Sequence, residues 1–133
     1  MSKRKYKYYH DENRQEKVSI DVELYNLIVL MNRLEWIQTT FCCYGHNDDD
    51  GSDGYISLYL DYNYLDRFCH ILDSVYHCMK VEIDYNRHGD GEVPGGWLYV
   101  VVRIPGTDYW VTKETLVKSL ERKFKKIRPL DKK

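Results

Sequence analysis

The chain has 133 residues, of which 43% are hydrophobic and 31% are charged, and its formal net charge is -1. That length matches one domain whose core needs no disulfide or metal to hold it together. The balanced charge gives no general case for binding nucleic acid or a membrane, and no stretch approaches the ~18 apolar residues of a membrane span. Four cysteines and a charged N-terminus without an apolar core predict free thiols in the cytoplasm.

The charges are unevenly placed along the chain. Cations gather near both ends, and an acidic cluster lies in the middle. We interpret the cations as solvated tails and the outer face of a helix. The predicted organisation is a polar N-terminal arm over 1–17, a single α+β domain over 18–128 and a basic tail over 129–133.

A helix and a hairpin are the first regular elements predicted. Ser19 or Asp21 can cap a helix whose apolar side chains recur at spacings of three and four up to about Leu34. Isoleucine, threonine, phenylalanine and cysteine predict a strand over 37–43, and strict alternation predicts a half-buried strand over 55–61. The acidic, glycine-containing segment between them is a hairpin loop.

The second half of the chain repeats this arrangement. A helix over 65–75 is followed by an alternating strand over 80–85, a glycine-rich loop and a strand over 97–104. Thr112 can cap a last helix. The order α-β-β-α-β-β-α predicts an α+β fold, with one four-stranded, mostly antiparallel sheet and helices on one face.

Residues 37–56 carry the most informative pattern. They follow I-x-T-x-x-x-C-x-G-H and then Y-I, at Ile37, Thr39, Cys43, Gly45, His46, Tyr55 and Ile56. The pattern resembles a group of small phage, prophage and bacterial proteins in which a helix also precedes it. The resemblance covers about the first half of the chain, and it implies a fold and a pocket but no activity.

A fainter similarity connects the same segment to the wybutosine-synthesising methyltransferase family, whose corresponding pattern is T-x-S-C-S-G. Here Cys42 and Tyr44 replace the serines of that family. His46 stands where that family has a basic residue.

The end of the strand over 37–43 is the first candidate site. Cys43 and His46 bring a thiol and an imidazole there, and Gly45 between them permits close approach of a ligand. Alternation predicts that Thr39, Phe41 and Cys43 share a face. We interpret this strand end as the edge of a small-molecule pocket; a structural cysteine, a turn glycine and a loop histidine form the alternative.

An arginine in the last strand extends this candidate site. Arg103 alternates with Tyr99 and Trp97, and an arginine beside aromatic rings can hold a phosphate while a base stacks. The alternative is an arginine on the open side of the sheet. The candidate ligand-binding residues are therefore Thr39, Cys43, Gly45, His46, Tyr55 and Arg103.

Metal sites have weaker support in the sequence. Cysteine and histidine are numerous enough for zinc but lack C-x-x-C pairs; they are Cys42, Cys43, His46, Cys69, His70, His77 and Cys78. The acidic loop lacks the bidentate glutamate of an EF-hand calcium site. We expect no metal and no cofactor.

The leading functional hypothesis is a protein of phage or mobile-element origin that binds a small polar, nucleotide-like ligand without turnover and sequesters it as a signal. One alternative is a small enzyme, either a Cys43–His46 hydrolase or a distant methyltransferase relative. Another is an interaction module that docks on a host protein or a nucleic acid through its basic ends. Tyrosine-rich strands and an open sheet face also favour a homo-oligomer.

Overall fold

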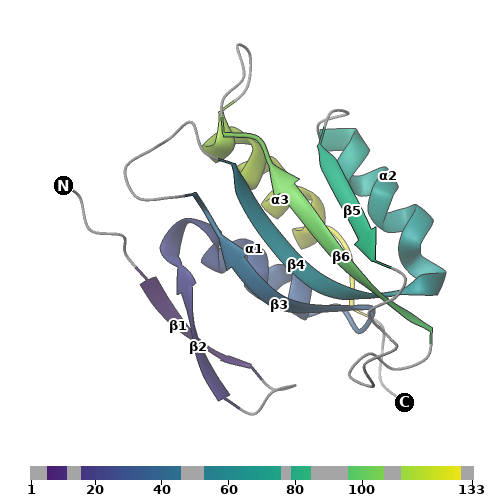
Figure 1. Ribbon diagram of the computed structural model, residues 1–133, viewed down its shortest axis with the longest axis horizontal. Helices are drawn as coiled ribbons and strands as arrows, with labels where there is room; N and C mark the ends of the chain where they lie inside the picture. Colours follow the sequence, from purple (N-terminus) through teal and green to yellow (C-terminus); the bar gives the residue numbers. More distant parts are fainter. Residues whose placement is uncertain are drawn as a thin grey trace.

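The computed structural model describes residues 6–11, 16–45, 53–75, 79–84, 96–106 and 112–129. Its elements are, in chain order, β1 (Tyr6–Asp11), β2 (Glu16–Asp21), α1 (Val22–Asn32), β3 (Ile37–Cys43), β4 (Gly54–Asp61), a 3-10 turn (Tyr62–Tyr64), α2 (Leu65–Val75), β5 (Lys80–Asp84), β6 (Trp97–Ile104) and α3 (Lys113–Lys125). Figure 1 shows the three helices on one side of a sheet, with β1 and β2 as a separate hairpin near its β3 edge.

The predicted α+β class and four-stranded antiparallel sheet are confirmed. The strand order is β3-β4-β6-β5, and each neighbouring pair is antiparallel. Both outer pairs, β3–β4 and β5–β6, join strands that follow each other along the chain. Pairing of β4 with β6 connects these two hairpins at the centre of the sheet (Figure 1).

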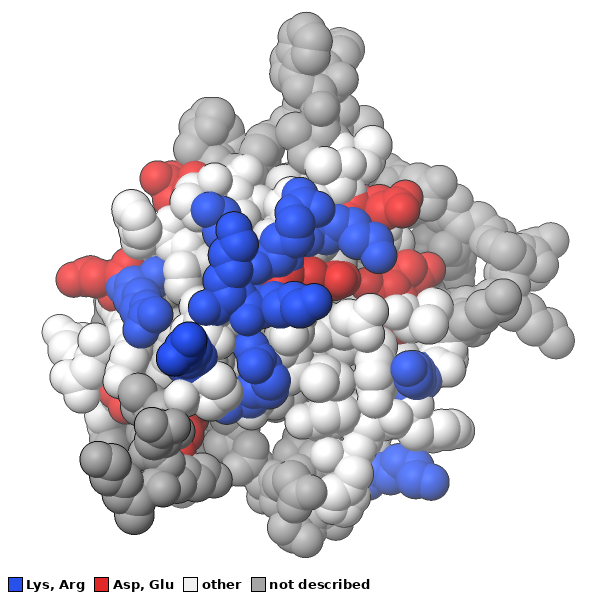
Figure 2. All heavy atoms as spheres, turned by 180° about the vertical axis from the view of Figure 1, so that it is seen from behind, with Lys and Arg blue, Asp and Glu red and all other residues white. Residues whose placement is uncertain are grey.

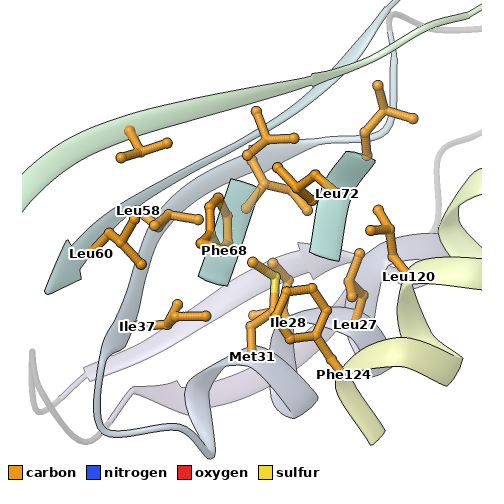
Figure 3. Packing of buried hydrophobic residues seen from close by; sticks show 14 of the residues in the cluster. Leu27, Ile28, Met31, Ile37, Leu58, Leu60, Phe68, Leu72, Leu120 and Phe124 are labelled. Atoms are coloured by element: carbon orange, nitrogen blue, oxygen red, sulfur yellow. The ribbon is translucent and has the colours of Figure 1, made fainter. Parts of the chain in front are cut away.

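The core lies between the sheet and the helices. Alternate residues of β4 and β6 point into it because successive side chains of a strand lie on opposite faces. The helices supply residues spaced three or four apart, and Figure 3 shows Leu27, Ile28, Met31, Phe68, Leu72, Leu120 and Phe124 converging on the sheet residues Ile37, Leu58 and Leu60. Each fully buried side chain of this kind contributes roughly 1.5–3 kcal/mol relative to an exposed one.

The N-terminal segment differs from the prediction of a polar arm over 1–17. Residues 6–11 form β1, which pairs with β2 in register from Tyr6 opposite Asp21 to Asp11 opposite Glu16. Its contacts with α1 explain its position: the Tyr9 and Tyr25 rings meet edge to face at 6.3 Å. Tyr9 thus connects the small sheet to the first helix, a tertiary contact that local sequence does not show.

Helix α1 begins directly after β2. Asp21 occupies the N-cap position, as predicted, but its carboxylate makes no capping bond and instead accepts a hydrogen bond from the Tyr44 backbone N–H at 2.7 Å. Thr112 caps α3 as predicted, because its Oγ1 accepts from the Thr115 N–H at 3.1 Å. Within the described part of the chain, no helix has both the length and the apolar character needed to cross a membrane.

Candidate functional site

The side of the four-stranded sheet turned away from the helices carries a layer of aromatic and polar side chains. We call it the open face; it comprises Phe41 and Cys43 of β3, Tyr55, Ser57 and Tyr59 of β4, Trp97, Tyr99, Val101 and Arg103 of β6, and Lys80 and Glu82 of β5. This face looks toward the viewer in Figure 1. It arises because the alternate residues of the same strands are committed to the core.

A β-bulge at Thr40 determines which residues of β3 belong to the open face. Thr39 pairs with Leu58, whereas Phe41 pairs with Ser57, so Thr40 is an extra residue in the ladder. Hydroxyl contacts hold it there: Thr40 Oγ1 lies 2.7 Å from Ser57 Oγ, which in turn accepts from the Phe41 N–H at 3.1 Å. Beyond the bulge, the alternation of β3 is reversed.

The bulge makes one sequence prediction wrong, because Thr39 does not share a face with Phe41 and Cys43. Thr39 is buried on the helix side, where its N–H donates to Asn32 Oδ1 at 2.9 Å and its hydroxyl accepts from Asn32 Nδ2 at 2.8 Å. The N–H and the hydroxyl of Thr39 are thereby both used to attach β3 to α1. Thr39 is therefore a structural residue and is not part of the open face.

Three of the predicted site residues do come together. Cys43 is directly opposite Tyr55, and Tyr55 is directly opposite Arg103, so they form one row across β3, β4 and β6. The pKa of Tyr55 is raised above its ordinary value of 10.0, mainly because the phenol is partly buried and secondly because the thiol of Cys43 lies beside it. The phenol therefore stays protonated near neutral pH and keeps its hydrogen-bond donor.

Arg103 is already engaged by an acidic neighbour. Its Nε donates to Glu82 Oε1 at 3.0 Å, and the two side chains are 42% and 44% exposed. The hydrogen bond from Arg103 lowers the pKa of Glu82, so its carboxylate remains charged to lower pH than an isolated one. The bond uses one of the five N–H donors of the guanidinium.

An aromatic pair lies in the next part of the open face. Tyr59 and Tyr99 are directly opposite each other on the two central strands, with ring centroids 5.7 Å apart and planes tilted by 58°. The alternation of the last strand predicts Tyr99 on the face of Arg103, whereas Tyr59 was not among the predicted site residues. The alternation of Tyr55, Ser57 and Tyr59 along β4 was the signal that could have found it.

The remaining predicted residues lie outside this row. Gly45 is buried just after β3 and has φ 144°, a left-handed conformation that favours glycine. Its carbonyl oxygen lies 3.5 Å from the Cys43 sulfur, which donates a weak hydrogen bond to it. His46 lies outside the described residues, as does most of the acidic loop.

Two buried charged residues surround Tyr44, on the helix side of this strand end. Asp21 and Lys113 are each 5% exposed. Asp21 accepts the Tyr44 backbone N–H, and the Lys113 ammonium lies 4.5 Å from the centre of the Tyr44 ring. A groove of about 350 Å³ begins beside Tyr44 and runs between α1 and α3. Asp21 and Lys113 therefore hold the end of β3 from the helix side, and neither side chain belongs to the open face.

The cysteines do not assemble a metal centre in the described part of the chain. Cys42 and Cys43 follow each other in a strand, so they point to opposite faces of the sheet. Burial, and secondarily the charge of Asp66, raises the pKa of Cys69 above 9.0, which suppresses its thiolate form. No group of three metal-ligating side chains occurs among the described residues, and His46, His77 and Cys78 lie outside them.

Comparison with protein-family models, with curated proteins and with solved structures found no match for this chain. Function is therefore inferred from the open face itself. Its combination of aromatic rings, a neutral phenol and an arginine can bind a planar, anionic molecule by stacking and charge-assisted hydrogen bonding.

Proposed function

We propose that the open face binds a small ligand that joins a planar ring to an anionic group, as a nucleotide does, and that it does so without converting the ligand. One observation carries the proposal. The Cys43–Tyr55–Arg103 row and the Tyr59–Tyr99 pair lie on the same face of the same strands, with the arginine at one end and the rings at the other.

The spacing between these two groups suits a ligand with two unlike ends. Tyr99 and Arg103 are four residues apart on β6, about 13 Å at the rise of a β-strand. The positions between them hold smaller side chains, Val101 on β6 and its partner Ser57 on β4. A ring stacked near the tyrosine pair would lie over this floor, and its anionic group would reach toward the guanidinium.

Glu82 sets the condition under which an anion can bind. Its carboxylate already accepts from Arg103 Nε, so a ligand anion near the guanidinium also meets a negative charge. A phosphate or carboxylate must use the other N–H donors of Arg103 or displace Glu82. Replacing Glu82 with glutamine removes the repulsion and should strengthen binding, whereas the loss of Arg103 should weaken it.

Calorimetric titration at neutral pH with AMP, ADP and GDP tests the proposal. Losing a hydrogen bond to a charged group costs about 1.5–3 kcal/mol, so Arg103→Gln should weaken binding about 10- to 100-fold. Tyr99→Leu should weaken it about 5- to 100-fold, because stacking of a base on an aromatic ring is worth about 1–3 kcal/mol. Lys17→Gln, which removes a cation from β2, is the matched control and should bind as the unaltered protein does.

Two results would overturn the proposal: that none of the three nucleotides binds, or that Arg103→Gln binds as tightly as the unaltered protein. Chromatography of the recovered nucleotide separates binding from catalysis. Intact nucleotide supports binding without turnover. A product that disappears in Cys43→Ala would instead establish the alternative of a cysteine-dependent enzyme.

A further inference from the structure

The helix side of the molecule carries a concentrated positive charge that the net charge of the chain conceals. Exposed cations from the middle of α3 to just beyond its C-terminal end form what we call the basic surface: Lys118, Arg122, Lys123, Lys125, Lys126 and Arg128. Figure 2 shows a continuous group of Lys and Arg side chains near the centre of this side. Between positions 118 and 128 the chain has one acidic residue, Glu121.

The outermost line of α3 is entirely cationic over this length. Lys118, Arg122 and Lys125 follow one another at spacings of four and three, opposite the buried residues Leu120 and Phe124. The first and last of the three are about 10.5 Å apart along the axis, at about 1.5 Å per residue. Like charges at these spacings repel each other, so the row lowers the stability of the protein on its own. A bound polyanion would reduce this repulsion.

A seventh cation fixes the end of this surface. Arg33, which follows α1, donates from one terminal guanidinium nitrogen to the carbonyl oxygens of Phe124 at 3.1 Å and Ile127 at 3.2 Å. The Phe124 carbonyl belongs to the last turn of α3 and the Ile127 carbonyl lies just beyond the helix, where a cation is also favoured by the helix dipole. The basic surface is therefore presented by a helix that is anchored to the core and tied to α1.

Three classes of anionic partner are a membrane, an acidic protein and a nucleic acid. The composition of the basic surface favours one of them. An interfacial membrane helix needs an apolar face directed at lipid, but the apolar face of α3 is buried. Protein interfaces are enriched in aromatic residues and depleted in lysine. Among the described residues, the exposed large hydrophobic side chains are Tyr6, Tyr8, Val22, Phe41 and Tyr62, and none lies on α3. Lysine and arginine alone suffice for contact with nucleic-acid phosphates.

We propose that the basic surface docks on the phosphate backbone of a nucleic acid, independently of its base sequence. Fluorescence anisotropy with a random-sequence duplex DNA of about 20 base pairs tests this directly. If about four cations contact phosphates, the logarithm of the binding constant falls against the logarithm of salt with a slope of about -3.6. Affinity then drops roughly 100-fold between about 50 and 200 mM salt.

The decisive variant replaces Lys118, Arg122 and Lys125 together with glutamine. Losing three phosphate contacts should flatten the salt slope by about 2.7 and abolish most binding at about 50 mM salt. A charge-matched control replaces Lys7, Lys17 and Lys80, which lie on β1, β2 and β5, and it should retain the slope. Thermal melting of both triple variants verifies that each is folded.

Parallel titrations identify the partner. Tight, salt-dependent binding of duplex DNA, of duplex RNA or of single strands supports the proposal and shows which nucleic acid is preferred. The proposal is overturned if none of these binds at about 50 mM salt, or if the decisive triple variant binds as the control does. It is also overturned if vesicles rich in phosphatidylserine, or polyglutamate, bind more tightly than every nucleic acid.

Discussion

Asn32 and Thr39 illustrate how one side chain can decide the position of a strand. The Asn32 amide group uses both its oxygen and its nitrogen on Thr39, so α1 and β3 are joined by two hydrogen bonds. The two residues are seven positions apart, and the chain turns back between them. The same contact places Thr39 on the helix side, just before the Thr40 bulge reverses the alternation.

We expect Asn32→Ala to destabilise the protein by about 1–3 kcal/mol, because it leaves the buried N–H and hydroxyl of Thr39 without a partner. Urea unfolding followed by circular dichroism measures the loss. Asn26→Ala, at an exposed position of the same helix, is the control and should change stability little. Alanine is a better helix former than asparagine, so helix propensity alone would not lower stability in either variant. A loss in Asn32→Ala no greater than that in Asn26→Ala would show that the bonds to Thr39 do not stabilise the protein.

The bulge also explains which part of the site could be read from the sequence. Simple alternation correctly placed Arg103 with Tyr99, because β6 alternates without interruption. It failed for Thr39, because the phase of β3 depends on hydroxyl contacts between Thr40 and Ser57, which are 17 positions apart. A strand carries its own period in its sequence, but the place where that period is interrupted depends on its partner.

At the scale of elements, the β3–β4 hairpin closes with very little space. A β-carbon added to Gly54 would lie 2.9 Å from the carbonyl oxygen of Cys43 and 3.0 Å from that of Tyr44. Both contacts are with backbone, which cannot rotate away as a side chain can. Gly54 therefore sets how closely the two strands approach where the Cys43–Tyr55 pair begins.

Gly54→Ala should destabilise the protein by about 1–3 kcal/mol through overpacking. Gly96→Ala is an informative comparison, because Gly96 has φ 89° and a β-carbon added there would have no atom within 4 Å. Asparagine tolerates left-handed φ, so Gly96→Asn should be milder than Gly96→Ala, while Gly54→Asn should be at least as harmful as Gly54→Ala. Denaturant midpoints of the four variants measure this, and the same order at both positions would contradict the steric explanation for Gly54.

The hairpin of β1 and β2 is the part of the fold that the sequence did not predict. The three helices and the strands of the four-stranded sheet can be predicted from the sequence, because each repeats an apolar period over several residues. Among the described side chains of β1 and β2, the buried apolar one is Ile20. Tyr9 of β1 acquires its role only by meeting Tyr25 of α1. For the same reason the local sequence indicates Ser19 as a helix cap, although Ser19 belongs to β2.

At the scale of the whole molecule, the open face and the basic surface lie on opposite sides of the sheet and helix layers (Figures 1 and 2). Arg103 belongs to one side and Arg122 to the other, and no side chain of the open face belongs to the basic surface. A small ligand on the sheet and a nucleic acid on the helices would therefore not compete for space.

Crossed variants test this independence. Arg103→Gln should lose nucleotide affinity and keep its affinity for duplex DNA, because the guanidinium lies on the open face. The triple glutamine variant of α3 should show the reverse, since its three substitutions lie on the helix side. Calorimetry and anisotropy on both proteins decide the matter; a loss of both activities in either variant would mean that the two ligands share one surface.

The central pairing of β4 with β6 has a consequence for how the molecule assembles. The β3–β4 and β5–β6 pairs each need only a local loop to close, whereas β4 meets β6 across the whole of α2 and β5. Loop closure becomes more costly with separation, and pairings between distant segments slow folding. We expect the two hairpins to form early and their seam to close late. Tyr59 and Tyr99 face each other across that seam, so this aromatic pair forms only when the last step of sheet assembly is complete.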